Sequence, residues 1–304
     1  MESIATREAY GKTLVELVEN KDIVVLDADL AGATKTAMFK KACPERFFDM
    51  GIAEGDMMGT AAGLAVSGKI PFASTFAIFA AGRGFEQIRN SICYPNINVK
   101  IAATHAGVTV GEDGGSHQAI EDISLMRSLP NMVVLNPADA VEARQMVLAA
   151  AEYVGPMYLR FGRAATPVIH DDSYKFELGK GEVVKEGKDV SIIATGIMVA
   201  KALEAAETLK AEGIDAEVIN ISTIKPLDNE LVLASAKKTG KVVTAEEHSI
   251  IGGLGSAVCE LLAEEHPVKV TRIGVKDCFG QSGSPAALLE HYGLTAADIV
   301  KACK

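Results

Sequence analysis

The sequence of 304 residues lacks the features that mark membrane proteins and nucleic-acid-binding proteins. No apolar run reaches the length of about 20 residues that a membrane-spanning helix needs. The 30 lysine and arginine residues form no block or stripe, and the formal net charge is −10. This charge pattern argues against a nucleic acid or an anionic membrane surface as a partner. The amino terminus has no signal-peptide core, so we expect a cytoplasmic protein.

Cysteine is scarce and scattered. The chain has five cysteines, an odd number, with no C-x-x-C pair among them. This pattern excludes a disulfide framework and gives no support to a cysteine metal site. The remaining composition, 48% hydrophobic and 23% charged residues, is that of a folded globular protein, and the length predicts two domains.

Helical and strand-like segments alternate along the chain. Short apolar runs bounded by polar residues predict buried parallel strands, and segments with apolar residues three and four positions apart predict helices. The expected strands are 22–27, 99–104, 132–135, 156–161, 190–195, 216–221, 241–244 and 268–273, with 69–73 leading into a pair of aromatic residues. The expected helices are 4–18, 53–67, 84–93, 119–127, 138–152, 198–212 and 228–238, then one that opens near Gly253 and further helices from 286 onward.

This alternation predicts an α/β protein with two doubly wound domains, each a parallel sheet with helices on both faces. The periodicity fades between residues 162 and 188, where the sequence is polar and contains glycine. We therefore expect a first domain over 1–165, a linker over 166–187 and a second domain over 188–304.

The stretch from Asp49 to Ile120 carries most of the chemical information. Glu54 opens a helix among Ala53, Met57 and Met58, a setting of low polarity in which a carboxyl group can keep or share a proton. The alternative is a first-turn glutamate favoured only by the helix dipole.

Phe76 and Phe79 follow a Ser-Thr pair at an expected strand end instead of filling a periodic core face. They are either core residues or a platform for a flat ring.

A glycine-broken loop follows the strand over 99–104. It carries His105, Glu112, Asp113 and His117, and we call residues 105–118 the histidine loop. Ligand-binding loops of open α/β sheets emerge from the carboxyl ends of strands, and histidine is suited to moving protons near neutral pH. A metal site here has no further ligand cluster to support it. The loop therefore indicates a functional site.

Taken together, these motifs closely resemble the transketolase family over essentially the whole chain. The resemblance rests on Gly51-Ile-Ala-Glu54, Ser74-Thr-Phe-Ala-Ile-Phe79, Thr104-His105, Val110-Gly-Glu-Asp-Gly-Gly-Ser-His-Gln118, Arg127-Ser-Leu-Pro-Asn131, Pro137-Ala-Asp139, Glu246-Glu-His248 and Gly252-Gly-Leu-Gly-Ser256. The first six resemble the thiamine-diphosphate pyrimidine-binding domain, and the last two resemble the transketolase C-terminal domain.

The resemblance also implies a missing part. Complete transketolases carry a further domain whose Gly-Asp-Gly motif and following asparagine hold a divalent metal and the cofactor's diphosphate, and no such motif is present. The chain therefore resembles the C-terminal subunit of a split transketolase. This implies a partner N-terminal subunit that holds Mg²⁺ or a similar ion, an assembly of two copies of each chain, and ketol transfer between sugar phosphates only in the complex.

The resemblance further implies roles for individual residues. Glu54 would share a proton with the pyrimidine ring of thiamine diphosphate. The other implied positions are Phe76, Phe79 and Asp29 for the cofactor, and Arg7, His105, Asp113, His117 and Arg163 for the substrate, with His105 and His117 also in catalytic roles. Arg163 fits the second phosphate arginine better than Arg160.

Several positions depart from the family pattern. Gly82 stands in the place of a third aromatic residue, Gly55 replaces a bulkier one, and Ala33 replaces a phosphate-binding serine. We expect a reshaped cofactor wall, with the hydroxyl of Thr34 as a substitute for the missing serine. The identities of the two sugars, and whether they are phosphorylated or sulfonated, stay open.

Three alternatives remain. A 1-deoxyxylulose 5-phosphate synthase would be expected to show Asp-Arg in place of Thr104-His105. The beta subunit of a 2-oxo acid dehydrogenase would lack the Gly-Glu-Asp-Gly run of 111–114. A non-catalytic regulatory subunit would not need Glu54 together with both histidines.

Overall fold

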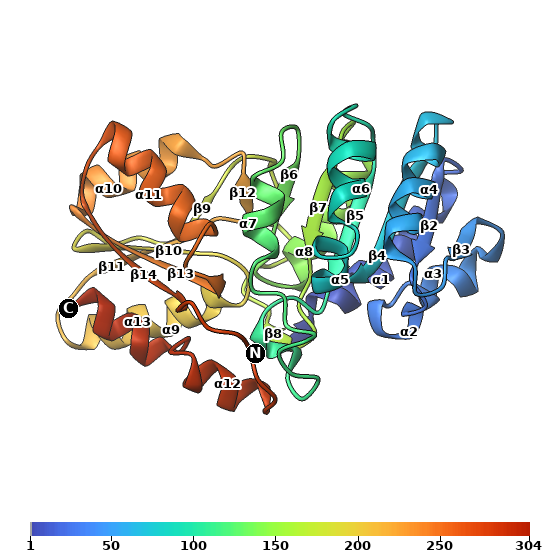
Figure 1. The fold of residues 1–304 in the computed structure, drawn as a ribbon. Helices are drawn as coiled ribbons and strands as arrows, with labels where there is room; N and C mark the ends of the chain where they lie inside the picture. The colour runs from blue at the N-terminus through green and yellow to red at the C-terminus, as the bar shows by residue number, and fades with distance from the viewer. Residues whose placement is uncertain (1) are drawn as a thin grey trace.

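The computed structural model describes residues 2–304, which form two α/β domains that lie side by side (Figure 1). Within the described chain, the first domain has a seven-stranded sheet in the order β12-β6-β7-β5-β4-β2-β3. Its strands are β2 Ile23–Asp27, β3 Phe47–Asp49, β4 Ile70–Phe76, β5 Lys100–Thr104, β6 Val133–Leu135, β7 Met157–Arg160 and β12 Thr223–Lys225. A separate antiparallel pair joins β1 Ser3–Ala5 to β8 Ala165–Pro167.

Helices cover both faces of this sheet. They are α1 Thr6–Glu16, α2 Ala31–Thr34, α3 Ala37–Ala42, α4 Glu54–Val66, α5 Ala77–Ala81, α6 Phe85–Gln87, α7 Asp122–Arg127 and α8 Ala140–Glu152, with a π-helical stretch at Ile88–Cys93. One face packs against α4 through Met57 and Met58, and the other packs against α1 and α8 through Tyr10 and Met146. Because both faces are covered, β2 and β5 are buried along their whole length.

The second domain has the same architecture on a smaller scale. Within the described residues, its five-stranded sheet runs in the order β14-β13-β10-β11-β9. The strands are β9 Glu182–Lys185, β10 Val190–Ala194, β11 Ala216–Asn220, β13 Lys241–Ser249 and β14 Lys269–Val275. The helices are α9 Met198–Ala211, α10 Asn229–Thr239, α11 Leu254–Glu265, α12 Pro285–His291 and α13 Ala296–Cys303.

The sequence-based α/β prediction is confirmed, but the sequence did not reveal the short strands β1, β3, β8, β9 and β12. β9 pairs antiparallel with β11, and β12 pairs antiparallel with β6 of the first domain. The expected linker over 166–187 therefore contains a strand, because β9 joins the second sheet. β12 also crosses back, so the second half of the chain completes the first sheet.

The linker between the domains is held by a buried polar cluster around His170. The carboxylate of Asp139 accepts hydrogen bonds from the backbone N–H groups of Ile169 and His170 at 2.7 and 2.8 Å. The His170 ring lies with Nδ1 3.0 Å from Asp139 and Nε2 2.9 Å from Glu182. Burial lowers the pKa of His170, but hydrogen bonds to these two carboxylates outweigh burial and raise the pKa to about 10.

We predict that His170→Gln destabilises the protein in a pH-dependent way. A histidine whose pKa is higher in the folded than in the unfolded state stabilises the fold fully below its unfolded pKa of about 6.5. That contribution is lost as the pH rises through about 10. Chemical denaturation of the wild-type protein and the variant should therefore show the largest difference in the free energy of unfolding at about pH 6. This difference should become smaller towards pH 10. A difference that is constant with pH would contradict the assigned charge state.

Candidate active site

The predicted site residues gather at the carboxyl ends of β2, β4 and β5. From β2 the chain moves to β3 on one side of the sheet and then returns to β4 on the other, so the strand order reverses between β2 and β4. Such a switch point leaves a crevice outside the strand ends, which is where open α/β sheets bind ligands. Glu54 lies at the start of α4, and Phe76 is the last residue of β4.

The Glu54 side chain is only 2% exposed. Its two carboxylate oxygens each lie 3.3 Å from Nη1 of Arg83, and the hydroxyl of Thr75 lies 3.4 Å from one of them. A buried carboxylate is costly unless it is paired and hydrogen-bonded, and these two groups compensate its charge. The first turn of α4 also favours negative charge. Glu54 is therefore buried, as its neighbours in the sequence suggested, and it is paired with the half-exposed Arg83.

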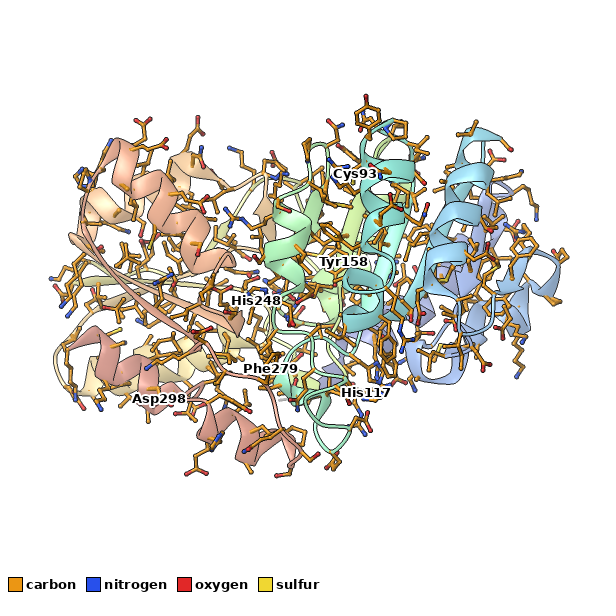
Figure 2. All side chains as sticks on the ribbon, viewed as in Figure 1. Cys93, His117, Tyr158, His248, Phe279 and Asp298 are labelled. Atoms are coloured by element: carbon orange, nitrogen blue, oxygen red, sulfur yellow. The ribbon has the colours of Figure 1, made fainter. Side chains whose placement is uncertain are left out.

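Phe76 and Phe79 form one wall of the site. Their rings are stacked with centroids 5.7 Å apart and an interplanar angle of 11°. The His105 ring stacks on Phe76 at 3.8 Å, and the His117 ring meets Phe79 edge-on at 5.5 Å. The two phenylalanines and the two histidines of the sequence prediction thus form a single aromatic cluster, and Figure 2 shows His117 at the lower edge of the first domain.

His105 has a strained backbone and a fixed tautomer. Its φ of 57° lies in the left-handed region, which is uncommon for a residue with a side chain and clusters at functional sites. Burial, followed by the charges of Arg7 and Arg163, lowers the pKa of His105 to about 3. The ring is therefore neutral at physiological pH. Nε2 lies 3.2 Å from Nη1 of Arg7, which can only donate, so Nδ1 carries the proton and donates to the Thr104 hydroxyl at 2.9 Å.

Two arginines surround the outer side of His105. Arg7 extends from α1 and donates to the carbonyl of Ala33 at 2.8 Å, while its buried Nε has no protein partner. Arg163 donates to the carbonyl of Val110 and lies 3.2 Å from Glu112. Burial and then the positive charge of Arg163 lower the pKa of Arg7. Such a pair is suited to an anionic group.

Arg160 is not available for such a role. It is 3% exposed, and its Nε forms a buried ion pair with Asp122 at 2.8 Å. Arg163, in contrast, is 34% exposed and pairs with the exposed Glu112.

The predicted role of Thr34 is wrong. Its hydroxyl is fully buried and donates to the carboxylate of Asp27 at 2.7 Å, so it cannot replace the serine hydroxyl missing at Ala33. Asp27 also accepts from the backbone N–H of Leu30 at 2.6 Å and from Thr36 at 2.8 Å, and burial raises its pKa to about 6. Sequence reasoning missed the structural role of Asp27, although an acid at a strand end followed by two threonines could have indicated it.

Within the described part of the chain, Asp29 and Asp113 form no hydrogen bond or ion pair with the cluster. Both side chains are exposed, and Asp29 adopts a left-handed φ of 62° beside the buried Asp27. Asp113 lies in the histidine loop between Gly111 and Gly114. Among residues 2–304, no group of three histidine, cysteine, aspartate or glutamate side chains comes together as a metal site.

Arg83 is the functional candidate that sequence reasoning missed. Its guanidinium lies 4.3 Å over the Phe79 ring and pairs with Glu54. Gly82 and Gly84 flank it, and a Cβ at these positions would lie 2.7 Å from the carbonyl of Ile78 and 2.9 Å from that of Ala80. The two glycines permit the tight turn that brings Arg83 over the ring. Gly82 is thus more than a lost aromatic residue, because this backbone has no space for a side chain there.

Comparisons with known proteins agree with this geometry. The family profile described as transketolase, pyrimidine binding domain matches residues 2–168, and that described as transketolase, C-terminal domain matches residues 179–299. A putative transketolase C-terminal section of Methanocaldococcus jannaschii is 52% identical over 97% of this chain and 94% of that protein. A 6-deoxy-6-sulfo-D-fructose transketolase subunit of a Clostridium species is 47% identical over 97% of this chain and 92% of its own length.

A solved structure described as a split gene transketolase, inactive beta4 tetramer, superposes with a TM-score of 0.91. It is 62% identical in sequence and covers 99% of this chain and 97% of its own.

The fold and the two matched domains define a protein of the thiamine-diphosphate-dependent type, because the pyrimidine-binding domain implies binding of that cofactor. The chain belongs to the transketolase family, as the C-terminal section of a split transketolase that contains the pyrimidine-binding and C-terminal domains.

We predict energetic coupling between Glu54 and Arg83. Arg83→Ala removes the cation from a buried carboxylate and should destabilise the free chain, whereas the same change in a Glu54→Gln background should cost less. Denaturant unfolding of the four proteins should give a coupling free energy of about 1 kcal/mol, a moderate value because Arg83 is half exposed. Effects that add within about 0.3 kcal/mol would contradict the pair.

Proposed function

We propose that this chain is the pyrimidine-binding subunit of a thiamine-diphosphate-dependent transketolase. The complex would transfer a two-carbon ketol unit from a ketose phosphate to an aldose phosphate. The observation that carries this proposal is the buried Glu54 carboxylate next to the stacked Phe76 and Phe79, with the neutral His105 and Arg7 on the far side. It combines a proton-sharing acid, flat apolar ring faces and an anion-binding end in one crevice.

The residues at the site fit the pyrimidine end of the cofactor. Thiamine diphosphate supplies, when bound, a carbanion that can accept and release a two-carbon unit. Glu54 would share a proton with a ring nitrogen in a hydrogen bond. Because Glu54 is buried, this hydrogen bond would be stronger than one in water. Phe76 and Phe79 would pack against the ring and exclude water. Arg83 must move away from Glu54 for this contact to form, because it occupies the same oxygens.

The substrate residues divide into a polar group near the reacting atoms and a charged group further out. His105, held neutral with Nδ1 bound to Thr104, would accept a hydrogen bond from a substrate hydroxyl group at Nε2 in place of the one from Arg7. His117 and Asp113 would contribute further polar contacts. Arg7 and Arg163 would hold a terminal anion, and the partnerless Nε of Arg7 is a donor left for it. The Clostridium relative is named for a sulfonated ketose, so phosphate and sulfonate ends both belong in a substrate screen.

The complex would need a second chain. Its diphosphate-binding N-terminal subunit would hold Mg²⁺, and two copies of each chain would assemble into a heterotetramer.

No helix within residues 2–304 has the length and apolar character needed to cross a membrane.

We predict that Glu54→Gln abolishes ketol transfer by the reconstituted complex. The chain should be inactive alone and active with its partner subunit, thiamine diphosphate and magnesium, and the variant should lose about a hundredfold or more in kcat. Asp56→Asn is the matched control, since Asp56 lies in the same first helical turn but is exposed. Full activity of Glu54→Gln, with assembly verified by size-exclusion chromatography, would refute the role of Glu54.

A separate test addresses the anion site. Arg7→Leu should raise KM for a ketose phosphate about tenfold or more, because it removes a charge-assisted contact, and should change KM for the unphosphorylated ketose little. Arg144→Leu, at an exposed pair with Glu16, serves as the surface control. Equal effects of Arg7→Leu on both ketoses would remove Arg7 from the anion site.

A further inference from the structure

The residues of the proposed site come from the first domain, yet the second domain reaches the histidine loop directly. Glu247 lies on β13 and is 4% exposed. Its carboxylate accepts a hydrogen bond of 2.6 Å from the backbone N–H of Thr109, which follows His105 by four positions. Gly107, midway between these two residues, has a left-handed φ of 79°, and a Cβ there would lie 2.2 Å from the Glu247 carboxyl carbon. The loop backbone therefore lies directly against this side chain.

The other end of the loop touches a second segment of the same domain, 280–283, which leads into α12. A Cβ on Gly114 would lie 2.5 Å from Oγ of Ser282, and one on Gly115 would lie 2.5 Å from the carbonyl oxygen of Gly280. The buried Gln118 donates from Nε2 to the carbonyl of Gln281 at 2.9 Å. Figure 1 shows this red segment beside the green histidine loop.

Gln118 also ties the two ends of the loop together. The same Nε2 lies 3.1 Å from the carbonyl of Val108 and 3.3 Å from that of Gly111. Its Oε1 faces Gly280, where a Cβ would come within 1.7 Å. Gln118 thus links the two ends of the loop to each other. Each end of the loop also contacts the second domain, one through Glu247 and the other through the segment 280–283.

A buried ion pair holds Glu247 in place. Arg160 on β7 pairs with Asp122 and donates from Nη2 to the backbone carbonyl of Glu247 at 3.0 Å and to that of Ala119 at 3.2 Å. The guanidinium of Arg160, at the end of β7, therefore contacts both Ala119, which follows the histidine loop, and Glu247 of the second domain. A planar group with several fixed donors suits this joint better than a single ammonium would.

We propose that Glu247 and the segment 280–283 are positioning elements of the second domain that set the conformation of the histidine loop, and with it the placement of His105, Asp113 and His117. This inference rests on the proposed function for its effect on catalysis, but its effect on the loop stands alone. A loop with four glycines between 107 and 115 has little conformational preference of its own. Its order has to come from contacts with neighbouring elements, and a displacement of about 1 Å at a catalytic group can cost a hundredfold in rate.

The direct test is hydrogen–deuterium exchange on the full chain alone and in the reconstituted complex. Glu247→Ala should speed exchange of the amides in 107–118 by about tenfold or more, because a buried hydrogen bond to a carboxylate is lost. In the complex, the variant should show a higher KM for the ketose phosphate and a lower kcat. Glu247→Gln keeps an oxygen acceptor for the Thr109 N–H group on a side chain of the same shape, and should restore loop protection and KM.

Glu246→Ala is the matched control. Glu246 is the adjacent residue, equally buried, and its carboxylate accepts from the backbone N–H groups of Leu254 and Gly255 at 2.7 and 2.8 Å. Its loss should speed exchange at the start of α11 and leave the histidine loop protected. A loop response in Glu246→Ala equal to that in Glu247→Ala would mean general loosening and would overturn the proposal.

Gly280→Ala gives a second route if Glu247→Ala does not fold. Its methyl group would collide with Gln118 and should speed exchange at 114–118 without touching Glu247. Unchanged loop exchange in a folded Glu247→Ala or Gly280→Ala protein would refute the positioning role. If instead the wild-type complex shows no ketol transfer, the proposed function fails while the exchange results still decide the role of the second domain.

Discussion

The site depends on a carboxylate that is kept out of water. Glu54 is buried at the start of α4, and a charge in such a position is stable only if nearby groups compensate it. The dipole of α4, the hydroxyl of Thr75 and the guanidinium of Arg83 together supply that compensation. Two of these are permanent features of the fold, whereas Arg83 is half exposed and its turn is built around two glycines. The charge of Glu54 is thus compensated in part by a cation whose side chain is half exposed to solvent.

The electrostatics of the outer site follow a different rule. Arg7 and Arg163 bring two positive charges next to His105, and a protonated imidazole there would add a third in a buried place. Burial and these charges keep the ring neutral, so its two nitrogens have one donor and one acceptor role. Two positive charges around a neutral hydrogen-bonding group would suit an anionic ligand, as we propose. They lie together although the whole chain carries a net charge of −10.

Much of this was predictable from the sequence, and the failures have physical causes. Long periodic segments predicted the α/β alternation because each helix and buried strand repeats its pattern over several residues. The three- and four-residue strands β12 and β9 exist only through pairing with distant partners, so their own residues carry no signal. Likewise, Glu54 could be selected from its neighbours, whereas Arg83 depends on a turn that only the folded backbone defines. The prediction for Thr34 was wrong because the sequence does not show that the Thr34 hydroxyl binds Asp27 in the folded protein.

The contacts across the domain boundary argue that the two domains form one functional unit. The histidine loop bears the polar residues of the site, but its glycines deprive it of intrinsic order. The carboxylate of Glu247 and the carbonyl of Gln281 accept hydrogen bonds from opposite ends of the loop, and Arg160 joins this contact to the first sheet. β12 makes the dependence mutual, since a strand from the second half of the chain completes the first sheet. The glycine-rich loop of the first domain therefore packs against the second domain, and in our proposal this contact sets the conformation of the loop.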